Sequence, residues 1–292
     1  MLIDVHCHPF DLFNTLQRTE NSEQIADNKE QNINNKDSIF LESALLDKAV
    51  LAVGNACDMT DLSFNEELSL NDIFKERFTL LSSFGIHPQI FKILNDKKQD
   101  LNNYNEINFN EQLLTLDKLA SEKRIIAIGE CGFDLFNASF KETEAIQERY
   151  FMTQIEIALR YNLPLVLHVR RAMHKIFALS KTLSKCKAVI FHSWSGTLDE
   201  GLSLLQRKVN VFFSFGNTIL LNHKQAINSC AHLPLDRFLT ETDAPYQRRR
   251  GELCSTWRDL QIIIEAFSGL REGLTALEAE NIVEGNWRNI FK

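Results

Sequence analysis

Short apolar runs alternate with amphipathic stretches along almost the whole chain. The runs fall at residues 2–8, 49–54, 80–86, 125–129, 165–167, 188–191, 209–213 and 238–242. Between them apolar residues recur every three or four positions, most clearly over 142–161 and 276–291, as on one face of a helix. Strands that alternate with helices are typical of a parallel sheet with crossover helices. Eight such units in 292 residues predict an α/β fold, a closed (β/α)8 TIM barrel.

An open, doubly wound sheet is the structural alternative. It commonly carries a glycine-rich turn after its first strand, and residues 2–8 are followed by no such turn. The polar stretches 18–37 and 95–110 contain too few apolar residues to fold alone, so we expect them to be loop insertions. The amino-acid composition shows no change along the chain that would mark a second domain, which predicts a single domain over residues 1–292.

The composition, 44% apolar and 24% charged, is that of an ordinary globular protein. No apolar run reaches the roughly 18 to 20 residues that cross a bilayer, and no cationic leader precedes the first run, so we expect a cytoplasmic protein without membrane contact. Six scattered cysteines without a Cys-x-x-Cys pair predict free thiols. A net charge of −7 supplies no global attraction for nucleic acid, so positive charge would have to come from bound ions or from a local cluster such as Arg248–Arg250.

Potential metal ligands stand where the apolar runs end. They are His6, His8, Glu130, His168, His192 and Asp243. All carboxyl ends of the strands of a barrel meet at one face, where active sites are built. Imidazole and carboxylate are ligands of zinc and of transition metals, so the pattern predicts a metal site. The competing interpretation is a set of histidines packed in the core, each with an ordinary hydrogen-bond partner.

Six ligands are more than one tetrahedral ion takes from a protein. We therefore expect two divalent ions, zinc, magnesium, manganese or iron, bridged by Glu130. His6, His8 and Asp243 would bind one ion, and His168 and His192 the other. Such a pair activates water for hydrolysis at phosphorus or carbon, and Asp243 has a second possible role as the acceptor of a proton from that water.

The motifs around these residues form a recognisable series. They are Asp4-x-His6-Cys7-His8, Gly85-Ile86-His87-Pro88, Ile128-Gly129-Glu130-Cys131-Gly132-x-Asp134, Leu167-His168-x-Arg170-x-Ala172, His192-x-x-Ser195-Gly196 and Glu241-Thr242-Asp243-Ala244-Pro245-Tyr246. In this order they resemble the TatD family of metal-dependent deoxyribonucleases. The resemblance implies a TIM barrel, two divalent ions, and hydrolysis of phosphodiester bonds in DNA, often from the 3′ end. We expect Glu130, as the bridge between the ions, and Asp243 to be the catalytic residues. The resemblance also implies that His87 and Arg170 line the substrate pocket, with DNA as the partner and no obligate protein partner.

The chain departs from the family pattern near the expected pocket. It has Pro9 after the first motif, Ser193-Trp194 where Cys-Phe is common, and after Tyr246 a segment without the usual Arg-Asn-Glu-Pro. These departures leave other functions open: an amidohydrolase-like or phosphotriesterase-like enzyme for a small amide, lactone or phosphoester, a non-catalytic barrel scaffold, or a metal-free barrel. A glutamate at position 130, instead of a lysine, argues against the phosphotriesterase type.

Overall fold

The computed structural model describes residues 1–23, 48–70, 76–92 and 104–291. Its strands are β1 (Leu2–Cys7), β2 (Val50–Ala56), β3 (Phe78–Phe84), β4 (Ala127–Asp134), β5 (Leu165–Arg170), β6 (Val189–Phe191), β7 (Val211–Phe215) and β8 (Phe238–Thr240). Its α-helices are α1 (Pro9–Glu23), α3 (Met59–Ser69), α5 (Tyr104–Ser121), α6 (Ala138–Lys141), α7 (Glu144–Tyr161), α8 (Met173–Ala178), α9 (Ser180–Leu183), α10 (Leu198–Gln206), α11 (Lys224–His232), α12 (Asp259–Gly269) and α13 (Ala276–Phe291). Two short 3-10 helices, η1 (Asn217–Ile219) and η2 (Leu235–Arg237), precede α11 and β8.

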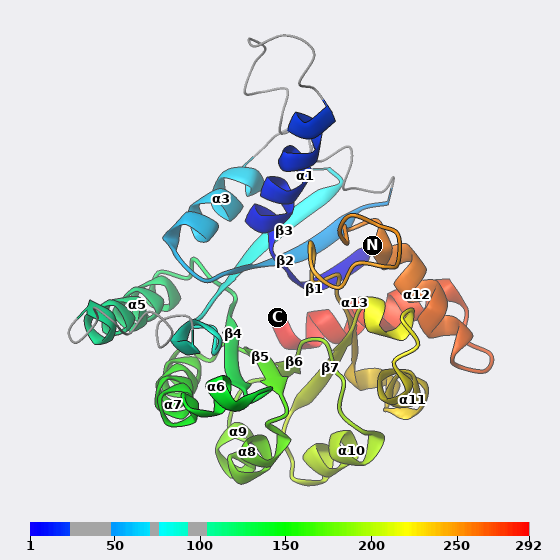
Figure 1. Ribbon diagram of the computed structural model, residues 1–292. Coiled ribbons are helices and arrows are strands. Elements are labelled where there is room, and N and C mark those ends of the chain that lie inside the picture. Colours follow the sequence, from blue (N-terminus) through cyan, green and yellow to red (C-terminus); the bar gives the residue numbers. More distant parts are fainter. Residues whose placement is uncertain (24–47, 71–75, 93–103, 292) are drawn as a thin grey trace.

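The strands form one parallel sheet in the order β1 to β8, and the helices surround it (Figure 1). The first strand meets the segment around the last one through backbone hydrogen bonds. Asp243 N donates to His6 O at 3.0 Å, and His8 N donates to Ala244 O at 2.7 Å. The sequential strand order and this seam exclude an open doubly wound sheet, and the predicted barrel is confirmed.

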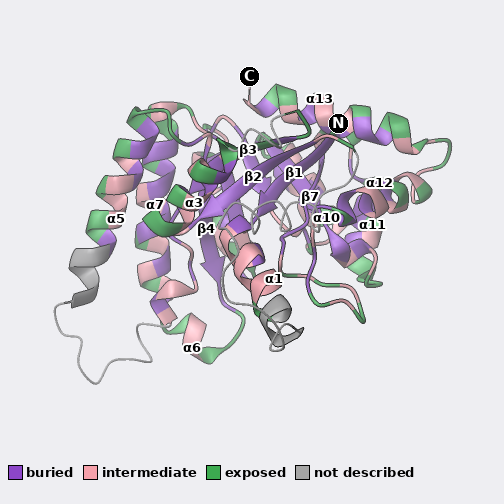
Figure 2. Ribbon diagram, turned by 90° about the horizontal axis from the view of Figure 1, so that it is seen from above, coloured by how far each residue is buried: buried purple, intermediate pink, exposed green. Residues whose placement is uncertain are grey.

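Six of the strands are buried along their whole length, as expected for a parallel sheet covered by helices, while β3 and β5 contain some more exposed positions. Figure 2 shows the buried strands in the middle of the molecule, with both chain termini on one side and α6 on the opposite side. No helix in the described part of the chain combines the length and the apolar character needed to cross a membrane.

Several predicted boundaries shift in the structure. The predicted insertion over 18–37 is wrong at its start, because α1 continues to Glu23, and the one over 95–110 is wrong at its end, because α5 begins at Tyr104. Pro9 favours the start of α1, since proline suits the first turn of a helix. The remaining parts of both stretches, and the helix expected after Ser38, lie outside the described residues.

Strand β4 is longer than its apolar run predicts. It continues past Glu130 to Asp134, and Gly132 and Asp134 pair with His168 and Arg170 of β5. Gly129 has a φ of +148°, and a Cβ there would lie 2.4 Å from Val166 O. Only glycine fits this backbone, which shifts the register of β4 just before Glu130. A charged residue inside a buried strand is tolerated because its carboxylate is surrounded by imidazoles.

Candidate metal centre

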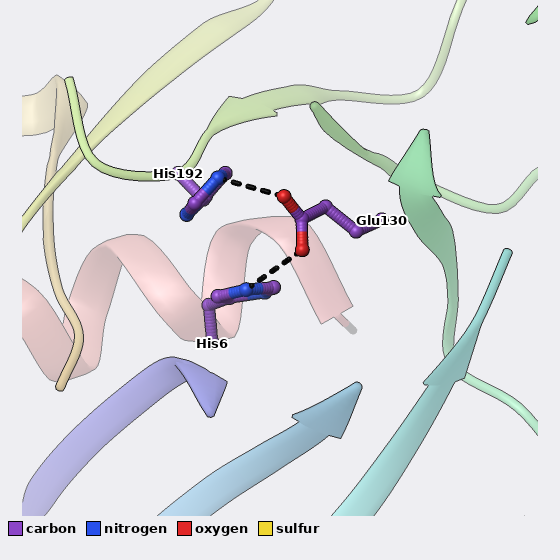
Figure 3. Close-up of side chains that lie close together, drawn as sticks. All are labelled: His6, Glu130 and His192. Carbon is purple, nitrogen blue, oxygen red and sulfur yellow. Dashed lines mark ion pairs between the residues drawn. The ribbon is translucent and has the colours of Figure 1, made fainter. Parts of the chain in front are cut away.

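Glu130 lies at the centre of the polar cluster, with each carboxylate oxygen facing a different group of histidines. Its Oε2 lies 3.2 Å from His6 Nε2 (Figure 3). The same oxygen lies 3.8 Å from His8 Nε2. Asp243 Oδ1 completes this half of the site at 3.5 Å from both imidazole nitrogens. Ligand atoms that share one ion at bonds of about 2.0–2.2 Å lie about 2.9–3.6 Å apart, so most of these spacings fit a shared cation.

The second oxygen of Glu130 faces the opposite half of the site. Its Oε1 lies 2.7 Å from His168 Nδ1, 2.8 Å from His192 Nε2 and 3.0 Å from His87 Nε2. The first two nitrogens are 3.3 Å apart. The ligands assigned from the sequence therefore fall into two groups around one carboxylate, the arrangement required of a bridging ligand. His87 also enters the second group.

Buried nitrogen atoms without hydrogen bonds support a cation in this site. Both ring nitrogens of His6 are buried without a hydrogen-bond partner, although the side chain is only 1% exposed. A buried polar atom left unpaired costs about 1–3 kcal/mol, which a barrel of ordinarily packed histidines would avoid. The donor set of imidazoles and carboxylates suits a divalent transition metal or zinc.

The electrostatics of the cluster keep its carboxylates ionised. Burial by itself raises the pKa of Glu130, but the charges of the neighbouring imidazoles, that of His192 foremost, hold it well below its usual value. Burial likewise raises the pKa of Asp243, and the hydrogen bond from His8 with the imidazole charges lowers it below normal.

The carboxylates in turn favour the protonated form of two imidazoles, His168 and His192. Burial lowers the pKa of His192, but Glu130 and Glu241 raise it well above its usual value. Burial also lowers the pKa of His168, but Asp134 and Glu130 raise it above its usual value. Burial dominates at His87 and lowers its pKa. A divalent ion at this site would displace protons from the imidazoles, as metals do when they bind titratable ligands.

Two further acidic residues, which are not among the predicted ligands, lie behind the histidines. Asp134 Oδ2 accepts from His168 Nε2 at 3.1 Å and from Gln89 Nε2 at 2.7 Å, which directs His168 Nδ1 toward Glu130. Glu241 Oε1 lies 3.7 Å from His192 Nδ1, close enough for charge attraction but too long for a hydrogen bond. Carboxylates in this position orient metal-binding imidazoles. In the sequence, only their positions within the TatD-like motifs distinguish Asp134 and Glu241 from other acidic residues.

Asp4 joins the first strand to the segment that carries Asp243. Its carboxylate accepts from Thr242 N at 3.0 Å, Thr242 Oγ1 at 2.6 Å and His6 N at 3.2 Å. Asp4 is fully buried, and burial raises its pKa to about 8 against the effect of these donors. The three hydrogen bonds fix the positions of His6 and Asp243 relative to each other.

Replacing Asp4 with alanine is expected to lower the free energy of unfolding by about 3 kcal/mol or more, because three donors would stay buried without an acceptor. Urea denaturation measures this loss. The control is Asp117→Ala, which removes a carboxylate of α5 that pairs with Arg160 at the surface and should cost less than about 1 kcal/mol. Equal losses in the two variants would contradict the role given to Asp4.

Comparison with known proteins identifies the family. A family model described as TatD related DNase matches residues 3–292. The chain belongs to this family. The sequence resemblance to TatD proteins is thereby confirmed.

Individual relatives in the TatD family are similar over part of the chain. A protein of Buchnera aphidicola named an uncharacterized metal-dependent hydrolase is 30% identical over 61% of the chain and 64% of its own length. A protein of Cronobacter turicensis named 3'-5' ssDNA/RNA exonuclease TatD is 34% identical over 56% of the chain and 57% of its own length. The chain thus spans less than two thirds of either relative.

A solved structure supports the fold. The crystal structure of a TatD homologue from Escherichia coli superposes with a TM-score of 0.71, at 23% identity, over 99% of this chain and 97% of that one. The likeness extends over the whole barrel.

Two residues that depart from the usual TatD pattern contact each other beside Asp243. Gln247 Nε2 donates to Asp243 Oδ2 at 2.7 Å and also to Ser193 Oγ. Ser193 donates through N and Oγ, both at 2.7 Å, to Glu241 Oε1, the carboxylate behind His192. The altered positions therefore form one network that connects the two halves of the site.

A cavity of about 480 Å³ opens onto the metal centre. His87 lines it, as the family resemblance implies, but Arg170 does not, because its guanidinium lies 3.7 Å from the centre of the Phe136 ring. One wall carries Asp11, Asp58 and Asp61, and no lysine or arginine is among the described lining residues.

The arginine run after Tyr246 supplies no charge to this cavity. Arg249 pairs with Glu252 and, at 3.1 Å, with Asp259. Arg248 and Arg250 are exposed, and none of the three lines the cavity. The run is a surface loop.

Proposed function

We propose that the chain, as one domain over residues 1–292, is a metal-dependent phosphodiesterase that removes nucleotides from the 3′ ends of single-stranded DNA. The observation that carries the proposal is Glu130, whose two oxygens face two separate groups of ligands. Membership of the TatD family and the names of its relatives, several of them nucleases, support the choice of bond.

Two divalent ions, zinc, magnesium or manganese, are proposed as cofactors. His6, His8 and Asp243 would hold the first, His168 and His192 the second, and Glu130 both. When bound, such ions lower the pKa of water and neutralise charge on a phosphoryl group.

The chain's own residues prepare the reaction around these positions. Asp243 Oδ1 points toward His6 and His8, while its Oδ2 accepts from Gln247, so the carboxylate is ionised and held for proton acceptance. His87 lines the cavity beside Glu130 with a lowered pKa. Gln89 N donates to its Nδ1 at 3.2 Å, so the single N–H of the neutral imidazole is on Nε2, 3.0 Å from Glu130 Oε1. With Glu130 engaged by cations, this N–H would be available to a phosphate oxygen.

We further propose a cytoplasmic location without membrane contact or an obligate protein partner. All six cysteines are unpaired, the state favoured in a reducing compartment.

The proposed reaction is tested with single-stranded oligonucleotides labelled at either end, in the presence of magnesium, manganese or zinc. The expected result is early release of the 3′ label as mononucleotide and late shortening of the 5′-labelled strand. Absence of metal-dependent cleavage with every ion would overturn the proposal.

Hydrolysis of a small amide, lactone or phosphoester is the second candidate function. The acidic wall of the cavity, formed by Asp11, Asp58 and Asp61, favours a neutral or cationic substrate over an extended polyanion. A screen of phosphodiester, amide and lactone substrates with the same metal-loaded protein separates the two candidates.

Replacing Gln247 with leucine is expected to lower kcat for phosphodiester hydrolysis by about tenfold, because residues that orient metal ligands typically contribute 10- to 100-fold. The substitution frees Asp243 Oδ2 and one side of Ser193, so metal affinity should fall in parallel. Steady-state kinetics and metal titration measure both effects. Gln261→Leu, a change in α12 away from the cavity lining, is the matched control, and identical behaviour of the two variants would contradict this role.

A further inference from the structure

Two arginines at the carboxyl end of β5 pack against an exposed aromatic ring that follows β4. The ring of Phe136, two residues beyond the end of β4, is 37% exposed. The guanidinium carbon of Arg170 lies 3.7 Å from the ring centre and that of Arg171 lies 4.6 Å from it. We call these three residues the Phe136 platform. Planar guanidinium groups stacked on an aromatic ring present outward-facing donors and a surface on which a base can stack.

The Phe136 platform is attached directly to the metal centre. Phe136 N donates to Asp134 Oδ1 at 2.9 Å, and the other oxygen of the same carboxylate contacts His168 Nε2 at 3.1 Å. Leu135 N donates to Arg170 O at 2.8 Å, which joins the two strand ends below the ring. A strand of nucleic acid that leaves the cavity on this side would meet the platform next.

Neither guanidinium is neutralised within the described part of the chain. Arg170 and Arg171 are exposed and pair with no carboxylate there, and the one hydrogen bond of Arg171 goes to Phe136 O at 3.1 Å. Arg249, in contrast, is held by Glu252 and Asp259. The platform therefore offers free positive charge in a chain whose net charge is −7.

Because the cavity is acidic, a polynucleotide would need positive charge outside it in order to bind. Its described lining contains acidic residues and no lysine or arginine, so bound cations can balance the phosphate that reacts but not those that follow. Single-stranded nucleic acid is generally bound by aromatic stacking together with basic side chains along the backbone.

We propose that the Phe136 platform binds the nucleotides on the 5′ side of the scissile phosphate in a single-stranded substrate. The inference rests on the proposed function and adds where the rest of the strand lies. It makes Phe136 and Arg171 determinants of the preference for long over short substrates.

The test compares a dinucleotide with a single-stranded 12-mer of DNA. The quantity compared is the ratio of kcat/KM for the 12-mer to kcat/KM for the dinucleotide. Phe136→Leu keeps apolar volume but loses the aromatic ring. This ratio should therefore fall about tenfold in Phe136→Leu, in keeping with the loss of one stacking contact. Arg171→Gln should lower the same ratio and reduce the salt dependence of 12-mer binding by about one counterion. Fluorescence anisotropy of a 5′-labelled phosphorothioate 12-mer gives affinities without cleavage.

Arg207→Ala is the matched control. Its guanidinium lies 5.3 Å from the Phe177 ring, but it precedes β7, at the opposite end of the barrel strands, so neither the ratio nor the affinity should change. Unchanged 12-mer affinity and ratio in both platform variants would overturn the inference. If wild-type protein cleaves neither substrate, the proposed function fails, and the anisotropy series still decides whether the platform binds single strands.

Discussion

Replacing Glu130 with glutamine is expected to lower kcat for phosphodiester hydrolysis on the order of 10³-fold or more, because one carboxylate serves both halves of the metal centre. The substitution exchanges one anionic oxygen for an amide that donates hydrogen bonds. That amide would face either the group of His6 or the group of His168 and His192, so at least one half would lose the negative charge that Glu130 supplies. Kinetics on the 3′-labelled oligonucleotide at saturating metal measure the loss.

The matched control for Glu130→Gln is Glu280→Gln. Glu280 is also a buried glutamate, 6% exposed, but it lies in α13 and pairs with Lys48 instead of facing the cavity. We expect this control to change stability and to leave kcat within about twofold, since Glu280 contacts neither the ligands nor the cavity lining. Comparable activity in wild type and Glu130→Gln would eliminate the two-ion arrangement.

The barrel and the positions of the ligands follow from local pattern. Alternating apolar runs specify strands and helices, and in a parallel barrel every strand ends at the same face. The position of a histidine such as His168 at the end of an apolar run therefore predicts that its side chain lies at this face of the barrel. This is why six residues, from position 6 to position 243, are found together as expected.

The supporting residues depend on contacts that no local pattern reports. Ser193 and Gln247 are 54 positions apart, and each is an unremarkable polar residue in its own segment. Asp134 looks like the polar end of a strand until its contact with His168 is seen. Arg170 stands in the expected motif, yet its guanidinium lies against the Phe136 ring, a cation–π contact that no local pattern reports.

The acidic wall of the cavity and the carboxyl end of β5 carry opposite charge, which bears on substrate choice. Asp58 and Asp61, on the loop after β2 and the first turn of α3, repel phosphate, whereas Arg170 and Arg171 at the carboxyl end of β5 attract it. Asp58 is also held by its capping bonds to Thr60 N and Asp61 N, so the acidic wall is a fixed part of the fold. On the proposed function, a polyanion would leave the site toward these arginines, in keeping with the removal of terminal nucleotides.

Removing divalent ions with a chelator is expected to abolish hydrolysis and to lower the midpoint of thermal unfolding by about 5 °C or more. An ion present at 100 times its Kd stabilises the folded state by about 2.7 kcal/mol, and each kcal/mol corresponds to about 2–4 °C in a chain of this size. Differential scanning fluorimetry measures the shift, and addition of zinc, magnesium or manganese should restore both properties.

Elemental analysis of protein purified without chelator completes this prediction. We expect two divalent ions per wild-type chain and about one in His168→Ala, because that change removes a ligand from only one half of the site. His232→Ala is the control, since His232 lies in α11, is not among the clustered ligands and hydrogen-bonds to Asn228 O, so two ions should remain. Wild-type protein without ions, and without a chelator-dependent shift in unfolding, would mean that the cluster is a set of packed histidines. In that case the unpaired nitrogens of His6 would have to be stabilised by water instead of metal.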